Sequence, residues 1–192
     1  TSHIYLESLG NLAERKGEWK KARDFYSRVS NHAPLNKMVR ISLARILHAK
    51  FGLTKSAHRI LDAVIMASEK SRDHQAWSDS LIEKGKIQQS LGLFNAANDY
   101  YLSAARKALV QDDVLSRVTQ IYREQEKYTG LQDFYTTWAK ELKGSSTLYA
   151  LHGELMANEL NKPKNSIQLF NKAILLEPSR SQLHNSLGLA LY

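Results

Sequence analysis

The chain has 192 residues, of which 43% are hydrophobic, and it carries a formal net charge of +8. A chain of this length and hydrophobicity can bury a core, which excludes an intrinsically disordered protein. The absence of cysteine excludes disulfide bridges, cysteine-ligated zinc and a cysteine nucleophile, and no apolar run reaches the ~20 residues of a membrane-spanning helix.

The first predicted elements are two helices separated by Gly17. The first helix has an apolar stripe that ends just before this glycine. The second places Ala22, Tyr26 and Val29 at steps of four and three, which puts the three side chains on one helix face. Glycine favours the end of a helix because it adopts a left-handed conformation without steric strain. The segment is therefore predicted to be an antiparallel helix pair.

The same pattern recurs along the chain. The position of Ala22 is repeated at steps of 35, 40, 34 and 35 residues, by Ala57, Ala97, Leu131 and Ser166. Four residues further on, the position of Tyr26 is filled by Leu61, Tyr101, Tyr135 and Phe170. An apolar stripe at helical spacing precedes each copy, so the repeating unit is a helix, a short turn and a second helix.

Three irregularities interrupt the repeat. The fourth copy has Glu126 where the first three have glycine, and the fifth has Asn161 there, followed by Pro163. The 40-residue step around residues 69–77 predicts either an extended helix or a longer loop.

The repeat resembles the tetratricopeptide repeat (TPR) family. The residues that carry the resemblance are Leu9, Gly10, Gly17, Ala22, Tyr26, Val29 and Pro34 in the first copy, and Phe170, Ala173 and Pro178 in the fifth. It implies an all-α fold, a right-handed superhelical α-solenoid of antiparallel helix pairs. We expect one array over residues 1–192, with repeats at 3–36, 38–71 (extended), 78–111, 112–145 and 147–180, and the first helix of a sixth at 181–192.

Members of this family usually bind other polypeptides in a concave groove lined by the first helix of each repeat. The resemblance therefore implies a non-catalytic scaffold that binds a peptide or a partner protein. Carried over by register, the groove residues are Asn11, Ser42, Leu43, Ile46, Glu83, Lys86, Arg117, Gln120, Leu151 and His152. The alternative is that these helices are rotated by one residue, which would place the apolar members in the core.

The chaperone-binding members of the family hold a carboxylate with Lys, Asn and Arg in these slots. Here only Asn11 and Arg117 match in type, and they lie three copies apart. Asp79 and Glu83 occupy slots between them and would repel a carboxylate. We therefore reject a chaperone-tail ligand.

The positive charge is concentrated at the start of the chain. Residues 1–60 contain twelve Lys and Arg residues against Glu7, Glu14, Glu18 and Asp24, whereas residues 61–192 contain fifteen charges of each sign. This asymmetry favours an acidic partner, and a basic N-terminal third that binds nucleic acid or another polyanion is the alternative function. The remaining interpretation is a solvated outer surface, because Lys and Arg side chains are usually exposed.

The sequence contains no catalytic, phosphate-binding or metal-binding motif. We therefore expect no cofactor and no enzymatic activity. The chain starts at Thr1 and ends within an apolar helix, so we expect a piece of a longer protein, or self-association through that last helix. We favour a cytoplasmic location and leave a periplasmic one, with a removed signal peptide, open, because cytosolic and periplasmic chains can both lack cysteine.

Overall fold

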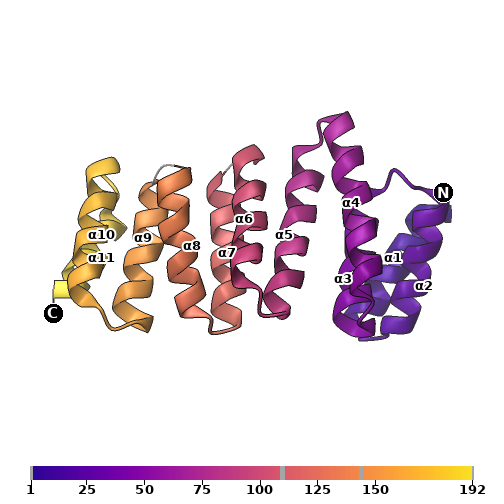
Figure 1. Ribbon diagram of the computed structural model, residues 1–192, viewed down its shortest axis with the longest axis horizontal. Coiled ribbons are helices and arrows are strands. Elements are labelled where there is room, and N and C mark those ends of the chain that lie inside the picture. The colour runs from indigo at the N-terminus through magenta and orange to yellow at the C-terminus, as the bar shows by residue number, and fades with distance from the viewer. Residues whose placement is uncertain (1, 109–110, 143–144, 192) are drawn as a thin grey trace. The chain divides into compact units, whose positions relative to one another are not determined.

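The computed structural model describes residues 2–108, 111–142 and 145–191, and all regular structure in these ranges is helical. The chain divides into two compact units, residues 1–109 and 110–192. Within each unit, consecutive helices are joined by short turns and run in opposite directions (Figure 1). The all-α prediction is confirmed. None of the described helices is both long and apolar enough to cross a membrane.

Unit 1 contains three helix pairs. Their bounds are α1 Ser2–Arg15 and α2 Trp19–His32, α3 Lys37–Phe51 and α4 Thr54–Ser71, and α5 His74–Ser90 and α6 Phe94–Lys107. Each helix packs against the next, and α3 also packs against α5. The side chains at the recurring second-helix positions, including Ala22, Tyr26, Leu61 and Val64, have no exposed surface.

The turn inside each pair contains a residue in the left-handed conformation, as the glycine spacing predicts. The φ angles are 72° at Gly17, 66° at Gly52 and 78° at Gly92. The two copies that lack glycine adopt the same conformation, with φ of 53° at Glu126 and 50° at Asn161. Asparagine tolerates this region, but a glutamate is sterically strained there. The turn geometry of the repeat is therefore kept where the glycine is lost.

Glycines in the first helices permit close packing against the second helices. A β-carbon on Gly85 would overlap the ring of Tyr101, and one on Gly10 would overlap the ring of Tyr26. Both tyrosine side chains are fully buried. The aromatic rings of the repeat thus lie directly on the glycine backbone of the preceding helix.

The 40-residue step is accommodated by extended helices. Helix α4 has 18 residues and α5 has 17, against 14 or 15 for the other helices of unit 1. Only Arg72 and Asp73 separate α4 from α5. The Asp73 carboxylate caps α5 by accepting a hydrogen bond of 3.0 Å from the backbone N–H of Ala76, and it forms an ion pair of 2.9 Å with Lys37. Of the two alternatives, the extended helix is therefore correct.

Unit 2 contains two further pairs and a last helix. Its elements are α7 Gln111–Glu124, α8 Tyr128–Glu141, α9 Ser146–Glu154 with the π-helical turn η1 Leu155–Glu159, α10 Pro163–Leu176 and α11 Ser181–Leu191. Aromatic rings fill the core between α7 and α8. Tyr122 stacks on Phe134 with ring centroids 6.2 Å apart, and Phe134 meets Trp138 edge-on at 5.4 Å.

The π-helical turn shifts the register of the fifth repeat. Gly153 lies under the ring of Phe170, as Gly10 lies under Tyr26, and the nearest ring atom is 2.8 Å from the position that a β-carbon on Gly153 would take. However, Gly153 and Phe170 are 17 residues apart in the sequence, whereas Gly10 and Tyr26 are 16 apart. A π-helical turn accommodates one extra residue, and η1 lies between the two. Positions in α9 that are assigned by counting back from the second helix, α10, are therefore displaced by one residue.

Candidate functional site

The first helices of unit 1 carry six of the ten predicted groove residues. Of these, Asn11 on α1 is exposed, and Ser42 on α3 and Lys86 on α5 are half-buried. We use the name first-helix face for the accessible predicted positions Asn11, Ser42 and Lys86 on α1, α3 and α5. These three side chains are polar, while α1 and α3 also expose apolar side chains, among them Ile4, Tyr5 and Met38.

Leu43 and Ile46 do not line an open surface. They are 5% and 2% exposed and belong to the hydrophobic core of unit 1. The physical reason is that α3 is covered by α2 and α4 and also by α5, so that opposite sides of the helix are buried. The two residues therefore lie in the core, as the alternative interpretation of the apolar groove positions places them.

Glu83 and Lys86 form a pair on α5. The Lys86 ammonium lies 2.9 Å from a carboxylate oxygen of Glu83, whose side chain is only 9% exposed. Removing a carboxylate from water is costly unless it is paired. Glu83 therefore serves as a fixed counter-charge, and Lys86, at 37% exposure, is the member of this pair that can reach a ligand.

Asn11 belongs to a hydrogen-bond network that links the first two repeats. The Tyr26 hydroxyl lies 2.7 Å from the Asn11 side-chain oxygen and 2.9 Å from a Glu14 oxygen. The other Glu14 oxygen accepts a 2.7 Å hydrogen bond from Arg45 on α3. Burial, together with the nearby Glu14 carboxylate, raises the pKa of Tyr26 far above its usual value. The hydroxyl therefore stays protonated, and its single proton is shared between the Asn11 and Glu14 oxygens.

The other four predicted residues lie in unit 2 and are not equivalent. Arg117 and Gln120 on α7 are exposed, and Gln120 donates a 2.8 Å hydrogen bond to Glu124. Leu151 on α9 is half-buried. His152 is 9% exposed and packs on the Tyr135 ring, with ring centroids 5.3 Å apart. Because of the shift at η1, His152 faces the core and not a groove.

The buried position of His152 affects its protonation. Burial, and to a lesser degree the charge of Lys172, lowers the pKa of His152 to about 4. Its Nε2 atom is buried and has no hydrogen-bond partner among the described residues. His152 is therefore neutral at pH 7 and acts as a packing residue.

Comparisons with known proteins address the fold. No protein-family model matches the chain, and no curated protein sequence matches it. A tetratricopeptide repeat protein from Parabacteroides merdae superposes with a TM-score of 0.54 at 14% identity, covering 97% of this chain and 70% of that one. The TPR2AB-domain:pHSP90 complex of yeast Sti1 gives 0.51 at 15%, covering 98% and 83%. A thermophilic TPR protein of Thermus thermophilus gives 0.50 at 14%, covering 98% of each chain.

The chain has the tetratricopeptide repeat fold. The left-handed turn five residues before the small residue is the feature of this fold that the sequence already displayed. The predicted groove residues divide into an accessible set and a buried set. Those that keep access to solvent are Asn11, Ser42 and Lys86 in unit 1, and Arg117, Gln120 and Leu151 in unit 2.

Two features of the TPR chain were not predicted. One is η1, for which the only sequence signal is the offset of Gly153 from the register of Phe170. The other is a pocket at the turn end of the first two repeats, which involves Trp19 and Phe51. Self-association through α11 stays a prediction. Leu183 is buried there, while Leu189 and Leu191 are 80% and 65% exposed.

Proposed function

We propose that this TPR chain is a non-catalytic scaffold that binds a peptide or a partner protein on its first helices. The observation that carries the proposal is the contrast between the two helix types. The second-helix ladder is fully buried, whereas polar side chains at the groove positions of the first helices keep access to solvent. The comparisons support the fold on which this proposal rests, and the yeast Sti1 structure shows a TPR domain in a complex.

The character of the surface determines the kind of ligand. In unit 1, the accessible predicted positions Asn11, Ser42 and Lys86 offer hydrogen-bonding groups and a cation, while Leu43 and Ile46 are withdrawn into the core. In unit 2, Arg117 and Gln120 offer the same kinds of group. An extended peptide presents backbone N–H and C=O groups that such side chains can pair. We therefore favour an extended, polar segment over an amphipathic helix as the ligand. The proposed binding requires no cofactor.

Site-specific photocrosslinking tests the proposal. Benzoylphenylalanine is placed at Ser42 on α3, and in separate proteins at Arg59, an exposed residue of the second helix α4. A partner bound to the first-helix face should be captured from Ser42 and not from Arg59. Equal capture from both sites, or capture from Arg59 alone, would refute the assignment of the surface.

Once a partner has been captured, its affinity for two matched variants of the chain provides a second test. Ser42 and Ser56 are both half-buried serines in unit 1, on α3 and α4 respectively. Ser42→Arg should weaken binding about tenfold or more by obstructing the face, whereas Ser56→Arg should change it less than about twofold. If the two variants weaken binding equally, the first-helix face is not the binding surface.

A further inference from the structure

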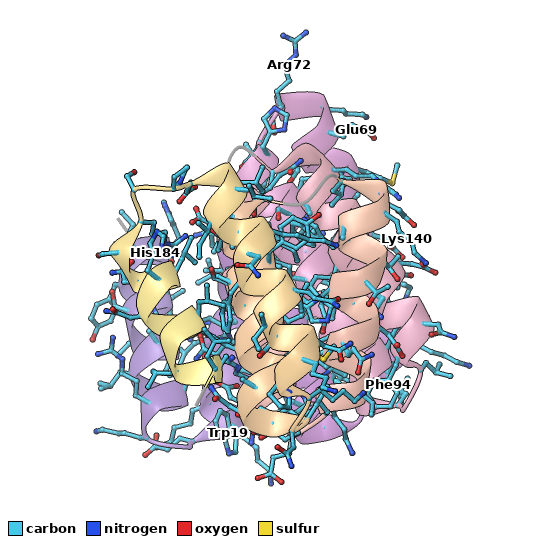
Figure 2. The ribbon with its side chains drawn as sticks, turned by 90° about the vertical axis from the view of Figure 1, so that its left-hand side faces the viewer. Trp19, Glu69, Arg72, Phe94, Lys140 and His184 are labelled. Atoms are coloured by element: carbon cyan, nitrogen blue, oxygen red, sulfur yellow. The ribbon has the colours of Figure 1, made fainter. Side chains whose placement is uncertain are left out.

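A pocket of about 450 Å³ lies where the turn of the first helix pair meets the end of α3. Glu18, Trp19, Lys20 and Lys21 contribute from the turn and the start of α2, and Lys50 and Phe51 contribute from the last residues of α3. Trp19 lies at the lower edge of the ribbon in Figure 2. We call this site the Trp19 pocket. It lies wholly within unit 1 and combines two aromatic rings with three lysines.

Two cations lie against the aromatic rings of the pocket, and one of them, Lys50, also lines it. The Lys50 ammonium lies 4.3 Å from the centroid of the Trp19 ring, and the Arg23 guanidinium lies 4.7 Å from that of Phe51. A cation in this position is attracted by the ring quadrupole. The rings therefore supply apolar walls and at the same time fix positive charge beside them.

The acidic side chains of the first 60 residues pair with other residues and leave Lys20 and Lys50 of the pocket uncompensated. All four carboxylates have partners: Glu7 accepts from Asn36, Glu14 pairs with Arg45, Glu18 with Lys21 and Asp24 with Arg23. Twelve Lys and Arg residues face these four carboxylates in the segment. In the pocket itself, Lys20, Lys21 and Lys50 stand against Glu18 alone. Three of the twelve cations thus line a site that also offers apolar surface.

We propose that the Trp19 pocket binds an acidic segment of a partner protein. An apolar side chain of that segment enters between Trp19 and Phe51, and carboxylates on either side of it contact Lys20 and Lys50, because Lys21 is already paired with Glu18. Charge complementarity selects the acidic character of the segment, and the two rings provide the buried anchor. This site differs from the first-helix face, because its residues come from the turn and the helix ends.

The same geometry disfavours a nucleic acid. Proteins that bind single strands combine aromatic side chains for base stacking with a positively charged groove that follows the backbone over several nucleotides. Here the basic side chains of the pocket are confined to Lys20, Lys21 and Lys50, and the Glu18 carboxylate forms part of the wall. A peptide carboxylate needs only one or two lysines, which the pocket provides.

Fluorescence anisotropy with a defined probe tests the proposal. The probe is a fluorescein-labelled octapeptide of sequence EEDLFEDE, titrated with the whole chain at low and at physiological salt. We expect saturable binding that weakens with salt, because the lysines concerned are exposed and screened. Replacing the central LF of the peptide by SS should weaken binding about tenfold or more, since the apolar anchor is lost. Absence of binding at low salt would overturn the proposal, and so would equal binding of the SS peptide.

Matched charge reversals locate the site. The double variant Lys20→Glu, Lys50→Glu should weaken peptide binding about tenfold or more, whereas the double variant Lys140→Glu, Lys164→Glu, with the same change of net charge on exposed residues of unit 2, should change it less than about threefold. Equal loss in both would indicate a non-specific charge effect and would overturn the proposal. An unlabelled twenty-nucleotide oligothymidine serves as competitor. Displacement of the peptide by the oligonucleotide at lower concentration than by unlabelled peptide would also overturn it, in favour of a nucleic-acid site.

The outcome of the peptide-binding experiments can be distinguished from that of the crosslinking test of the first-helix face. The crosslinking site Ser42 is not part of the Trp19 pocket, and Lys20 and Lys50 are not among the groove positions. Loss of peptide binding with retained capture from Ser42 would leave the proposed scaffold function in place.

Discussion

Substitution of Gly85 by alanine probes the packing that defines the repeat. The ring of Tyr101 is fully buried and lies where the new β-carbon would be. Inserting a methyl group into a packed core costs about 1–3 kcal/mol, and the severe overlap places Gly85→Ala toward the upper end, at about 2–3 kcal/mol. Alanine is about 1 kcal/mol better than glycine inside a helix. The expected net loss is therefore about 1–2 kcal/mol.

Urea unfolding followed by far-ultraviolet circular dichroism measures this effect. With a slope of about 2 kcal/mol/M, the midpoint for Gly85→Ala should fall by about 0.5–1 M. Gly188→Ala in α11 is the control, because no atom of the described residues, apart from its chain neighbours and the backbone of its own helix, lies within 4 Å of the position that its β-carbon would take. There only the helix propensity acts, and the midpoint should rise or stay unchanged.

A double substitution separates the overlap from other effects. In a background of Tyr101→Leu, the ring is absent and the cost of Gly85→Ala should largely disappear, which gives a coupling free energy of about 1–2 kcal/mol. If Gly85→Ala is as stable as the unchanged chain, or if its cost persists without the ring, the explanation by close packing is incorrect.

Three further predictions concern stability. His152 has a pKa of about 4 in the folded chain and about 6.5 when unfolded. Its contribution to the free energy of unfolding is therefore complete above pH 6.5 and is lost as the pH falls toward 4. Urea unfolding at several pH values should show a loss of about 3 kcal/mol over this range, and His152→Leu should remove this pH dependence. Thr119→Val breaks the buried 2.7 Å hydrogen bond to the Tyr135 hydroxyl and should cost about 1–3 kcal/mol in urea unfolding, while Thr119→Ser should cost less. Glu126→Gly relieves the left-handed backbone at φ 53° and should raise the melting temperature, with a gain of about 1 kcal/mol; a lower melting temperature would contradict the steric argument.

The repeat itself was determined by local patterns in the sequence. A helix pair with a left-handed turn depends on residues that are close along the chain, so the spacing from Gly17 to Ala22 and Tyr26 was sufficient to predict it. The same local rule also applied at Glu126 and Asn161, because both occupy the glycine slot even though the residue differs.

The site depended on packing between helices that are distant in sequence. Whether Leu43 and Ile46 face solvent depends on α5, which covers α3, and the orientation of His152 depends on the extra residue held by η1. The Trp19 pocket requires Lys50 and Phe51 to meet a turn more than 25 residues earlier in the chain. Local periodicity fixes which face of a helix is apolar, but only tertiary contacts decide how much of the opposite face is also covered.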